Sequence, residues 1–282
     1  MFKRQTSGSV VCVSCGYLVG VNDDKCYHCG RRNPGLWGFA PALRSLGQDL
    51  GFVNFVTATC VVVYVITLLL SGTGLGQPTM SGFLAPSPGA LFTFGASGAF
   101  PVFEFGRWWT VLSAGWLHGG FFHILFNLYW IRQLAPSVAE LFGPGRMVLV
   151  YTAGCVLGFL LSSVAGQFLT VLPILQGGQL TVGASAPIFG LLGALVCYGR
   201  RTGSSVITSQ VWPLAIIMFV FGFLGRGTDN WAHLGGFAGG YLAALWLDPH
   251  RPERVDHMLW AVICLALSVL SILASVVTAY LG

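Results

Sequence analysis

The stretch that decides the fold reads G-A-S-A-P-I-F-G-L-L-G-A-L, residues 183–195, and in it a serine opens an apolar run. Pro187 follows closely after Ser185, and proline is tolerated in a first helical turn because its missing N–H has no helical partner there. Small residues recur along the run, and such faces let helix backbones approach closely in lipid. They are Gly183, Ala186, Gly190 and Gly193. The stretch predicts a tightly packed helix that opens near Ser185.

The composition of the chain places this helix in a bilayer. Of the 282 residues, 55% are hydrophobic and 8% are charged, and the mean hydropathy is +0.75. A soluble domain carries about a quarter charged residues, so this chain cannot cover its surface with water-facing side chains. The formal net charge of +5 matters less than where the positive residues lie, because Lys and Arg bias membrane orientation.

Seven apolar runs are candidates for membrane spans. A span needs about 20 mainly apolar residues to cross a hydrocarbon core of about 30 Å. The fourth, fifth and sixth runs are short, and they are interpreted as spans because polar breaks separate them. The runs are 52–71, 121–142, 147–167, 184–199, 211–225, 231–247 and 258–281. The expected fold class is an all-α polytopic membrane protein.

The positive residues indicate how the spans are oriented. With a cytoplasmic amino terminus, eleven positive residues lie inside and two, Arg107 and Arg226, lie outside, as the positive-inside rule expects. The carboxyl terminus then lies outside. No organelle-targeting peptide is visible, so a bacterial plasma (inner) membrane is the expected location. The inside residues are Lys3, Arg4, Lys25, Arg31, Arg32, Arg44, Arg146, Arg200, Arg201, Arg251 and Arg254.

One charged residue falls inside a predicted span. Arg132 lies within the second run, where a charge is costly unless it faces the bundle or finds a partner. Glu140 is eight residues further on, roughly on the same face, and is the expected partner in a structural pair. This interpretation is favoured over a transport role.

Reactive side chains gather at three helix ends that share one membrane depth in this orientation. The second span opens with H-G-G-F-F-H-I-L-F-N, which supplies His118, His123 and Asn127. The fourth opens at Ser185, and the sixth supplies His233 from N-W-A-H. Taken singly, each is more often structural than functional. Together, a hydroxyl, an imidazole and further donors are the groups that nucleophilic acyl transfer needs.

This pattern resembles the rhomboid family of intramembrane serine proteases over roughly residues 50–250. The resemblance rests on three motifs in chain order: HGGFFHILFN at 118–127, GASAPIFGLLGAL at 183–195 and AHLGGFAGG at 232–240. It implies a rhomboid core of six transmembrane helices. The last apolar run then resembles an extra carboxyl-terminal helix that some members add to this core.

The resemblance also implies a Ser–His dyad without an acidic third member. In it Ser185 is the nucleophile, and His233 is the general base and later the acid for the leaving amine. His123 and Asn127 match the positions that stabilise the oxyanion, joined by the backbone N–H of Ser185. These two residues are four apart, so they face the same side of one helix.

Further parts of the sequence can be compared with the rhomboid family, and some match it while others differ. His118 is similar to a position that supports the site, and Phe189 matches an aromatic position that packs on the catalytic imidazole. The family usually has glycine immediately after its serine, whereas this chain has Ala186, which bears on efficiency and fine specificity. The segment G-R-W-W-T at 106–110 looks like the family's tryptophan–arginine region in altered order, and its expected role is to anchor a membrane-lying loop.

A second serine lies in a better match to the frame found in serine hydrolases, G-A-S-G at residues 95–98. It precedes the His-rich motif, and no apolar helix follows it. Gly, Ser and Pro mark turns. Ser97 is therefore interpreted as part of a mobile glycine loop and not as a nucleophile.

The amino-terminal residues form a separate module with the spacing C-x2-C-x10-C-x2-C at 12–29. Two such pairs satisfy the tetrahedral preference of structural Zn²⁺. Two disulfides are the alternative, which a reducing cytoplasm disfavours. His28 is expected at the surface, because four cysteines already close the metal shell. The four ligands are Cys12, Cys15, Cys26 and Cys29.

The expected organisation has four parts. They are a zinc ribbon at 1–33, a linker at 34–51, a rhomboid protease core at 52–250 and the added helix at 251–282. A short amphipathic segment in the linker could lie in the inner membrane interface. Its apolar residues are Trp37, Phe39, Leu43 and Leu46. The ribbon could bind a cytoplasmic protein or nucleic acid, or merely cap the terminus.

The expected function is an intramembrane serine endopeptidase that cleaves transmembrane-helix substrates within the lipid bilayer. Catalysis should need no cofactor, and the resemblance places substrate entry near residues 211–231. The alternative is a catalytically inactive rhomboid-like protein that binds membrane clients. It would need neither Ser185 nor His233. A transporter is more distant, because only Arg132 and Glu140 supply charge along a bundle interior.

Overall fold

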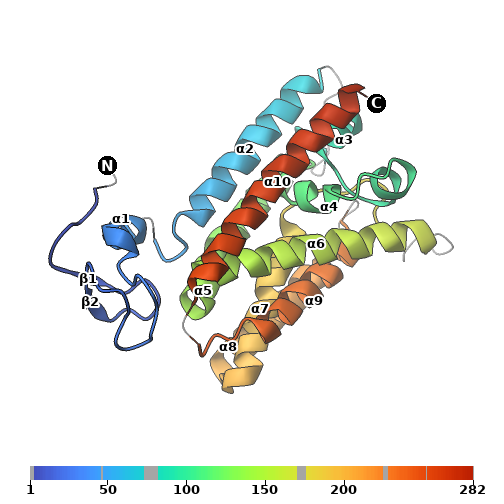
Figure 1. Cartoon of the computed structure of the whole chain (residues 1–282). Coiled ribbons are helices and arrows are strands. Elements are labelled where there is room, and N and C mark those ends of the chain that lie inside the picture. The colour runs from blue at the N-terminus through green and yellow to red at the C-terminus, as the bar shows by residue number, and fades with distance from the viewer. Residues whose placement is uncertain are drawn as a thin grey trace.

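The computed structural model describes residues 3–45, 47–72, 82–169, 176–224, 228–251 and 253–281. Long helices make up most of it, and a small antiparallel hairpin of β1 (Ser9–Val11) and β2 (Leu18–Gly20) precedes them (Figure 1). Short turns of 3₁₀ or π helix occur at Leu36–Gly38, Phe100–Glu104 and Ala114–Trp116. The helices are α1 (Ala40–Arg44), α2 (Phe52–Leu70), α3 (Pro88–Phe94), α4 (Thr110–Ser113), α5 (Phe121–Phe142), α6 (Pro144–Phe168), α7 (Ser185–Thr202), α8 (Ser205–Leu224), α9 (Asn230–Trp246) and α10 (Val255–Leu281).

The seven predicted apolar runs correspond to α2 and to α5–α10. By length and composition alone, Phe52–Leu70, Pro144–Phe168 and Asp256–Leu281 can cross a membrane, and Ser205–Val220 is a shorter apolar helix. The prediction of an all-α polytopic membrane protein is confirmed. Arg226, one of the two positive residues expected outside, does not belong to the described residues.

Helices α6, α7 and α9 form the closely packed centre of the bundle. Gly236 and Gly240 of α9 face α7 so closely that an added Cβ would collide with the carbonyl groups of Ala186 and Gly190. A Cβ on Gly154 of α6 would lie 2.9 Å from the Cα of Gly190. The small face predicted for 183–195 is therefore confirmed on α7, and Gly236 and Gly240 give α9 a matching small face. They bring together the two helices that carry Ser185 and His233, because small residues let backbones touch in lipid.

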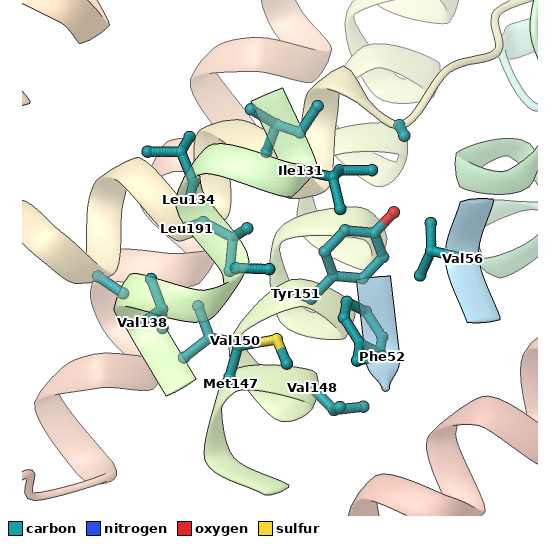
Figure 2. Close-up of a cluster of buried hydrophobic side chains, with 14 of the residues drawn as sticks. Phe52, Val56, Ile131, Leu134, Val138, Met147, Val148, Val150, Tyr151 and Leu191 are labelled. Atoms are coloured by element: carbon teal, nitrogen blue, oxygen red, sulfur yellow. The ribbon is translucent and has the colours of Figure 1, made fainter. Parts of the chain in front are cut away.

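A large apolar cluster joins α2, α5, α6 and α7 (Figure 2). Phe52 packs edge to face on Tyr151, with ring centroids 5.1 Å apart. Ile131 of α5, Met147 of α6 and Leu191 of α7 are fully buried in the same cluster. Lipid tails are as apolar as these side chains, so close van der Waals packing stabilises the cluster more than removal from water does. This packing fixes α5, which carries His123 and Asn127, against the centre of the bundle.

The segment between α2 and α5 contains α3, α4 and two helical turns. Arg107 is buried in it, lies 4.2 Å above the Phe92 ring and donates to the Phe92 carbonyl at 3.3 Å. This burial lowers the pKa of the Arg107 guanidinium. Trp109 Nε1 donates to Ser275 Oγ of α10 at 3.0 Å. Residues 106–110 thus hold the segment against α10, while their anchoring in a membrane stays a prediction.

Ser97 lies in this segment and is fully buried, so the prediction of a mobile loop is wrong. Its N–H donates to Thr181 O at 3.0 Å, and its carbonyl accepts from Thr181 N at 2.7 Å. Its hydroxyl accepts a hydrogen bond from Thr110 Oγ1 at 3.2 Å. Gly95 and Gly98, with φ of 98° and 125°, allow the turns on either side of it. Glycine here permits a tight, paired conformation.

The expected pair between Arg132 and Glu140 is not formed. Both residues are exposed, and no ion pair joins them in the part of the chain that the structure describes. Eight residues of helix advance about 12 Å, which is a long reach for a direct contact even on one face. A shared helical face was therefore insufficient grounds for the pairing.

In the linker, Trp37 and Phe39 are 61% and 41% exposed. The Leu43 side chain and the whole of Leu46 lie outside the described residues. A position of this segment in the inner membrane interface stays a prediction.

Candidate active site

Ser185 is the first residue of α7, at the end of a segment that is held from two sides. Gly183 N donates to Ala114 O at 2.9 Å, and Thr181 pairs with Ser97 just upstream. The first N–H groups of a helix have no acceptor within the helix, so the Ser185 N–H is not used by α7 itself. The fold thus presents a hydroxyl and a backbone donor at the same residue.

His233 lies in the first turn of α9 and faces Ser185. Its Nε2 is 2.9 Å from Ser185 Oγ. The imidazole stacks on the Phe189 ring, with centroids 4.3 Å apart and an interplanar angle of 15°. Among the described residues, His233 Nδ1 has no hydrogen-bond partner. If the Ser185 hydroxyl donates to Nε2, the ring proton of neutral His233 resides on Nδ1.

His123 lies beside the serine, and one of its hydrogen bonds fixes its tautomer. Its Nδ1 accepts a hydrogen bond from Gly119 N at 3.2 Å, so a neutral ring carries its proton on Nε2. A Cβ built on Gly183 would lie 2.6 Å from His123 Nε2 and 3.7 Å from Ser185 Oγ. With φ of +133°, Gly183 also has a backbone conformation that other residues avoid. The position thus leaves space in which the His123 N–H and the serine hydroxyl come near each other.

Asn127 follows His123 by one helical turn and is 4% exposed. Its Nδ2 has no hydrogen-bond partner in the ranges that the structure describes. A buried donor without a partner is unusual and is explained most simply by a ligand or water that completes it. His118 is fully buried, with its ring centroid 5.3 Å from that of His123.

Asp229 is a neighbour of the site that the sequence analysis missed. It is the N-cap of α9, and its Oδ1 accepts from Ala232 N at 3.0 Å. Its Oδ2 accepts a short hydrogen bond from Ser162 of α6. Both carboxylate oxygens therefore accept from groups other than His233. His233 Nδ1 lacks a partner within the described chain. An aspartate three residues before a helical N–H is a common cap, and that pattern in D-N-W-A could have revealed it.

Ala186, the departure from the family pattern, has a matching space on α6. It is fully buried, and its methyl group faces Gly158. A Cβ built on Gly158 would lie 2.7 Å from Ala186 Cβ and 2.7 Å from Ala232 O. The extra methyl beside Ser185 is therefore accommodated by a missing one on the facing helix.

The geometry of this site suits acyl transfer. It brings together a hydroxyl, an imidazole within hydrogen-bond reach and a nearby N–H donor on His123, which are among the parts that such a reaction requires. Of the predicted site residues, Ser185, His233 and Phe189 are in direct contact, and His123, His118 and Asn127 line the same region. Ser97 is held separately, by Thr181 and Thr110.

The four amino-terminal cysteines lie together as a candidate metal centre. All four Sγ atoms are within 4.8 Å of one another, with Cys12–Cys29 at 3.8 Å and Cys15–Cys26 at 3.6 Å. Tetrahedral zinc with Zn–S bonds of about 2.3 Å needs sulfurs about 3.8 Å apart. Burial, together with hydrogen bonds with Cys15 and Cys26, raises the pKa of the Cys29 thiol to about 12. A bound cation would allow all four to be thiolates.

The rest of the ribbon fits this interpretation. The first cysteine pair lies in the connection between β1 and β2, and the hairpin buries Val10 and Val19 in one cluster with Cys12. His28 is exposed, as predicted, and stacks on Tyr17 with ring centroids 3.7 Å apart. The residues present therefore fit a structural metal held by four thiolates.

The ribbon contacts the bundle at the connection between α9 and α10. Ser14 Oγ and Arg31 donate to the Glu253 carbonyl at 3.1 and 3.3 Å. Glu253 Oε1 accepts from Arg146 N, in the first turn of α6, at 2.8 Å. Burial raises the pKa of the Glu253 carboxyl, while the Arg146 N–H and the charges of Arg31 and Arg146 oppose that shift. A cavity of about 440 Å³ lies at this junction.

Fold and site together define an all-helical membrane protein with a serine and a histidine paired inside its bundle. The Rhomboid domain model matches residues 105–250, slightly more than half of the 282 residues. The chain belongs to the rhomboid family, as its motifs suggested.

Several curated proteins are similar to this chain. Rhomboid protease GluP of Bacillus subtilis (strain 168) is 32% identical over 168 residues, which cover 58% of this chain and 31% of the relative. RHOMBOID-like protein 4 of Arabidopsis thaliana is 29% identical over 205 residues, covering 65% and 50%. Putative rhomboid protease YdcA of Bacillus subtilis (strain 168) is 30% identical over 152 residues, covering 53% and 71%. This chain spans about a third to a half of the length of the first two.

Proposed function

We propose that this chain is an intramembrane serine endopeptidase in which Ser185 is the nucleophile and His233 the general base. The observation that carries the proposal is the 2.9 Å separation of Ser185 Oγ and His233 Nε2 in a member of the rhomboid family. Relatives named rhomboid proteases support the same activity. A client-binding protein without activity would have no need of this contact.

Acylation begins when His233 Nε2 takes the Ser185 hydroxyl proton as Oγ attacks the scissile carbonyl carbon. The carbonyl π electrons move to oxygen and form a tetrahedral oxyanion. When it collapses, the C–N bond breaks and His233 Nε2 gives its proton to the leaving amine. The acyl group then remains on Ser185 as an ester.

The oxyanion would be stabilised by three donors: the Ser185 N–H, His123 Nε2–H and Asn127 Nδ2–H. His123 can donate from Nε2 because its Nδ1 already accepts from Gly119. Asn127 Nδ2 has no competing acceptor among the described residues. Donors that are fixed before the charge develops need little reorganisation, and each contributes roughly 3 kcal/mol to lowering the barrier.

Deacylation reverses the roles with water as nucleophile. His233 Nε2 takes a water proton, the hydroxide forms a bond to the acyl carbon, and the ester C–O bond breaks. The proton then returns from Nε2 to Ser185 Oγ. The chemistry needs no cofactor, but water must reach the site from the adjacent membrane surface because the bilayer interior supplies none.

The substrates we propose are transmembrane helices of other proteins in the lipid bilayer. A helix hides its carbonyl carbons, so a cleavable one must unwind locally, and helix-breaking residues near the scissile bond would favour this. We place substrate entry near residues 211–231, of which 225–227 lie outside the described residues. In support, Ile216, Ile217 and Val220 of α8 are each about half exposed, which suits contact with lipid or an apolar helix.

The amino terminus is proposed to be cytoplasmic and the carboxyl terminus outside, in the inner membrane of a bacterium. In support, positive residues expected inside lie near one another: Arg201 pairs with Asp248 at 3.6 Å, and Arg146 bonds the Arg251 carbonyl at 2.7 Å. Positive residues gathered at one end of the bundle favour a cytoplasmic position for that end.

In the ribbon, Cys12, Cys15, Cys26 and Cys29 would hold Zn²⁺. When bound, the ion cross-links the two cysteine pairs and so stabilises a module too small to fold on a hydrophobic core. A cytoplasmic partner for the ribbon remains part of the proposal.

The test is labelling of the detergent-solubilised full chain with a fluorophosphonate probe, which reacts with activated serines. We expect labelling of the native chain and of Ser97→Ala, and none of Ser185→Ala. His233→Ala should label at least a thousandfold more slowly, because the imidazole activates the hydroxyl. A folded native chain that neither labels nor cleaves would favour the client-binding alternative. Loss of labelling in Ser97→Ala alone would overturn the site assignment.

A further inference from the structure

The starting observation is one buried hydroxyl on α6 that touches the segments leading to both reactive residues. Ser162 is fully buried and donates to Asp229 Oδ2, in the residue that begins α9. Its own oxygen accepts from Gly178 N at 3.0 Å, in the segment that leads into α7. Both α7 and α9 pack against α6, so this hydroxyl connects three adjoining elements (Figure 1).

The Asp229 side of this connection continues directly to His233. Asp229 Oδ1 accepts from Ala232 N at 3.0 Å, and its carbonyl accepts from His233 N at 3.2 Å. These bonds fix the first turn of α9. A shift of Asp229 relative to α6 would therefore move His233 with it.

The Gly178 side continues to Ser185. Gly178 O accepts from Ala99 N at 2.9 Å, so this segment is held by the folded region before α5. A Cβ built on Gly178 would lie 2.8 Å from Asp229 Oδ2, which shows how closely the two segments approach. The segments that carry Ser185 and His233 are thus both hydrogen-bonded to the same residue of α6, Ser162.

The geometry does not place Asp229 as a third catalytic acid. In a catalytic triad the carboxylate accepts from the Nδ1–H of the histidine. Here both carboxylate oxygens bind other donors, and His233 Nδ1 has no partner in the described part of the chain. The role left to the carboxylate is to hold α9 against α6.

We propose that Asp229, through its hydrogen bonds to Ser162 and Ala232, is a positioning residue that sets the distance between Ser185 and His233. The inference rests on the proposed proteolytic function, because it assigns the cause of the dyad geometry. The positioning role needs the two hydrogen bonds of the side chain at position 229 and not a negative charge there.

The first test separates the hydrogen bonds of residue 229 from its negative charge. It is a kinetic comparison of full-length variants with a transmembrane substrate. Asp229→Ala should lower kcat roughly 10- to 100-fold, since a displacement of about 1 Å can cost that much. Asp229→Asn keeps an amide oxygen to accept from Ala232 N and places an NH2 group to donate to Ser162 Oγ, so both bonds persist without the charge and kcat should stay within about threefold of native. The pH dependence of kcat should keep its midpoint in Asp229→Asn. Equal loss of kcat in the Asn and Ala variants would overturn the proposal in favour of a role for the charge.

A matched control separates positioning from general destabilisation. Ser87 is the N-cap of α3, where it accepts from Ala90 N at 3.2 Å away from the dyad. Ser87→Ala should lose a comparable cap and keep its kcat. Ser162→Ala should lower kcat, and the loss in the double variant Ser162→Ala/Asp229→Ala should be smaller than the two single losses combined, because both single variants remove the bond between Ser162 and Asp229. Additive losses would contradict this shared action.

A structural readout distinguishes failure of this inference from failure of the proposed function. In an experimental structure of Asp229→Ala we expect Ser185 Oγ and His233 Nε2 to be more than 3.5 Å apart, whereas Ser87→Ala keeps the native separation. An unchanged separation in Asp229→Ala overturns the positioning role even if the protein is a protease. An inactive native chain in which Asp229→Ala still lengthens this distance would overturn only the proposed function.

Discussion

At the end of the bundle where α6 begins, the Arg146 guanidinium donates to the carbonyls of Asp248 and Arg251 at 3.0 and 2.7 Å. At the end where α7 begins, Asn127 Nδ2 and His233 Nδ1 are buried without a partner among the described residues. We call the first region the ribbon junction (Arg31, Arg146, Asp248, Arg251 and Glu253) and the second the dyad end (His123, Asn127, Ser185 and His233).

Both regions bury polar groups, but most of these groups are hydrogen-bonded at the ribbon junction, whereas some at the dyad end lack a partner in the part of the chain that the structure describes. At the ribbon junction, Arg146 also donates to Phe142 O and His257 Nδ1, and its backbone N–H binds Glu253. Arg31 Nε is the exception, a buried nitrogen without a partner in the described ranges. Satisfied networks rigidify a fold, whereas buried groups without partners lower stability unless something else completes them. This difference indicates that the junction stabilises the structure and the dyad end is built to bind.

The largest change should come from breaking the ribbon junction. Arg146→Ala keeps the backbone N–H that bonds Glu253, but it removes a positive charge near that buried carboxylate and the guanidinium bonds to three carbonyls, so we expect a loss of about 3–5 kcal/mol in unfolding free energy. Thermal unfolding of the full chain in detergent measures it. The control is Arg200→Ala, an exposed arginine in the last turn of α7, which should change stability by about 0.5 kcal/mol or less. Equal effects in the two variants would contradict the structural role of the junction.

The opposite response is expected at the dyad end. Asn127→Ala removes a buried donor that has no partner within the described chain, so stability should be unchanged or higher. The same change should lower kcat about 10²- to 10³-fold, because an oxyanion donor is lost. Parallel unfolding and cleavage measurements on one preparation check both. A variant that loses stability and keeps its kcat would show that Asn127 is structural.

The contrast also explains how much the sequence could predict. Ser185, His233, His123 and Asn127 were identifiable because their motifs are local and sit at the openings of apolar helices. The small face of α7 was likewise visible as spacing. Each of these features depends only on residues close together in the chain.

Features that join distant segments were missed or predicted wrongly. The contacts between Ser162 and Asp229 and between Arg146 and Glu253 depend on how helices are placed, which periodicity does not give. The expected pairing of Arg132 was wrong because a shared helical face does not ensure contact. Glycines around Ser97 were interpreted as mobility, although they allow its tight pairing with Thr181.

A smaller effect should follow from filling the space opposite Ala186. Gly158→Ala would place a methyl group about where Ala186 Cβ and Ala232 O approach, and such overpacking costs about 1–3 kcal/mol. The double variant Gly158→Ala/Ala186→Gly moves the methyl to the facing helix and should recover the part of that stability that the contact with Ala186 costs, while the close approach to Ala232 O remains. Thermal unfolding of the single and double variants measures the coupling. Additive losses would show that the two positions do not compensate each other, and that the packing beneath the dyad is looser than the distances indicate.

The smallest effect tests whether the ribbon junction depends on the metal centre. Removing the ion with a chelator should unfold the ribbon, because little else would then hold the four cysteines together. Ser14 and Arg31 would then no longer donate to the Glu253 carbonyl, and two such bonds contribute about 1 kcal/mol each. The thermal midpoint of the bundle should therefore fall by a few degrees and recover when Zn²⁺ is restored. Ser14→Ala lacks one of the two bonds from the start, so the chelator should shift its midpoint less. If the chelator does not change the thermal midpoint of the bundle, the ribbon contacts the junction without stabilising it. The difference in hydrogen bonding between the ribbon junction and the dyad end would then depend only on residues of the helical bundle.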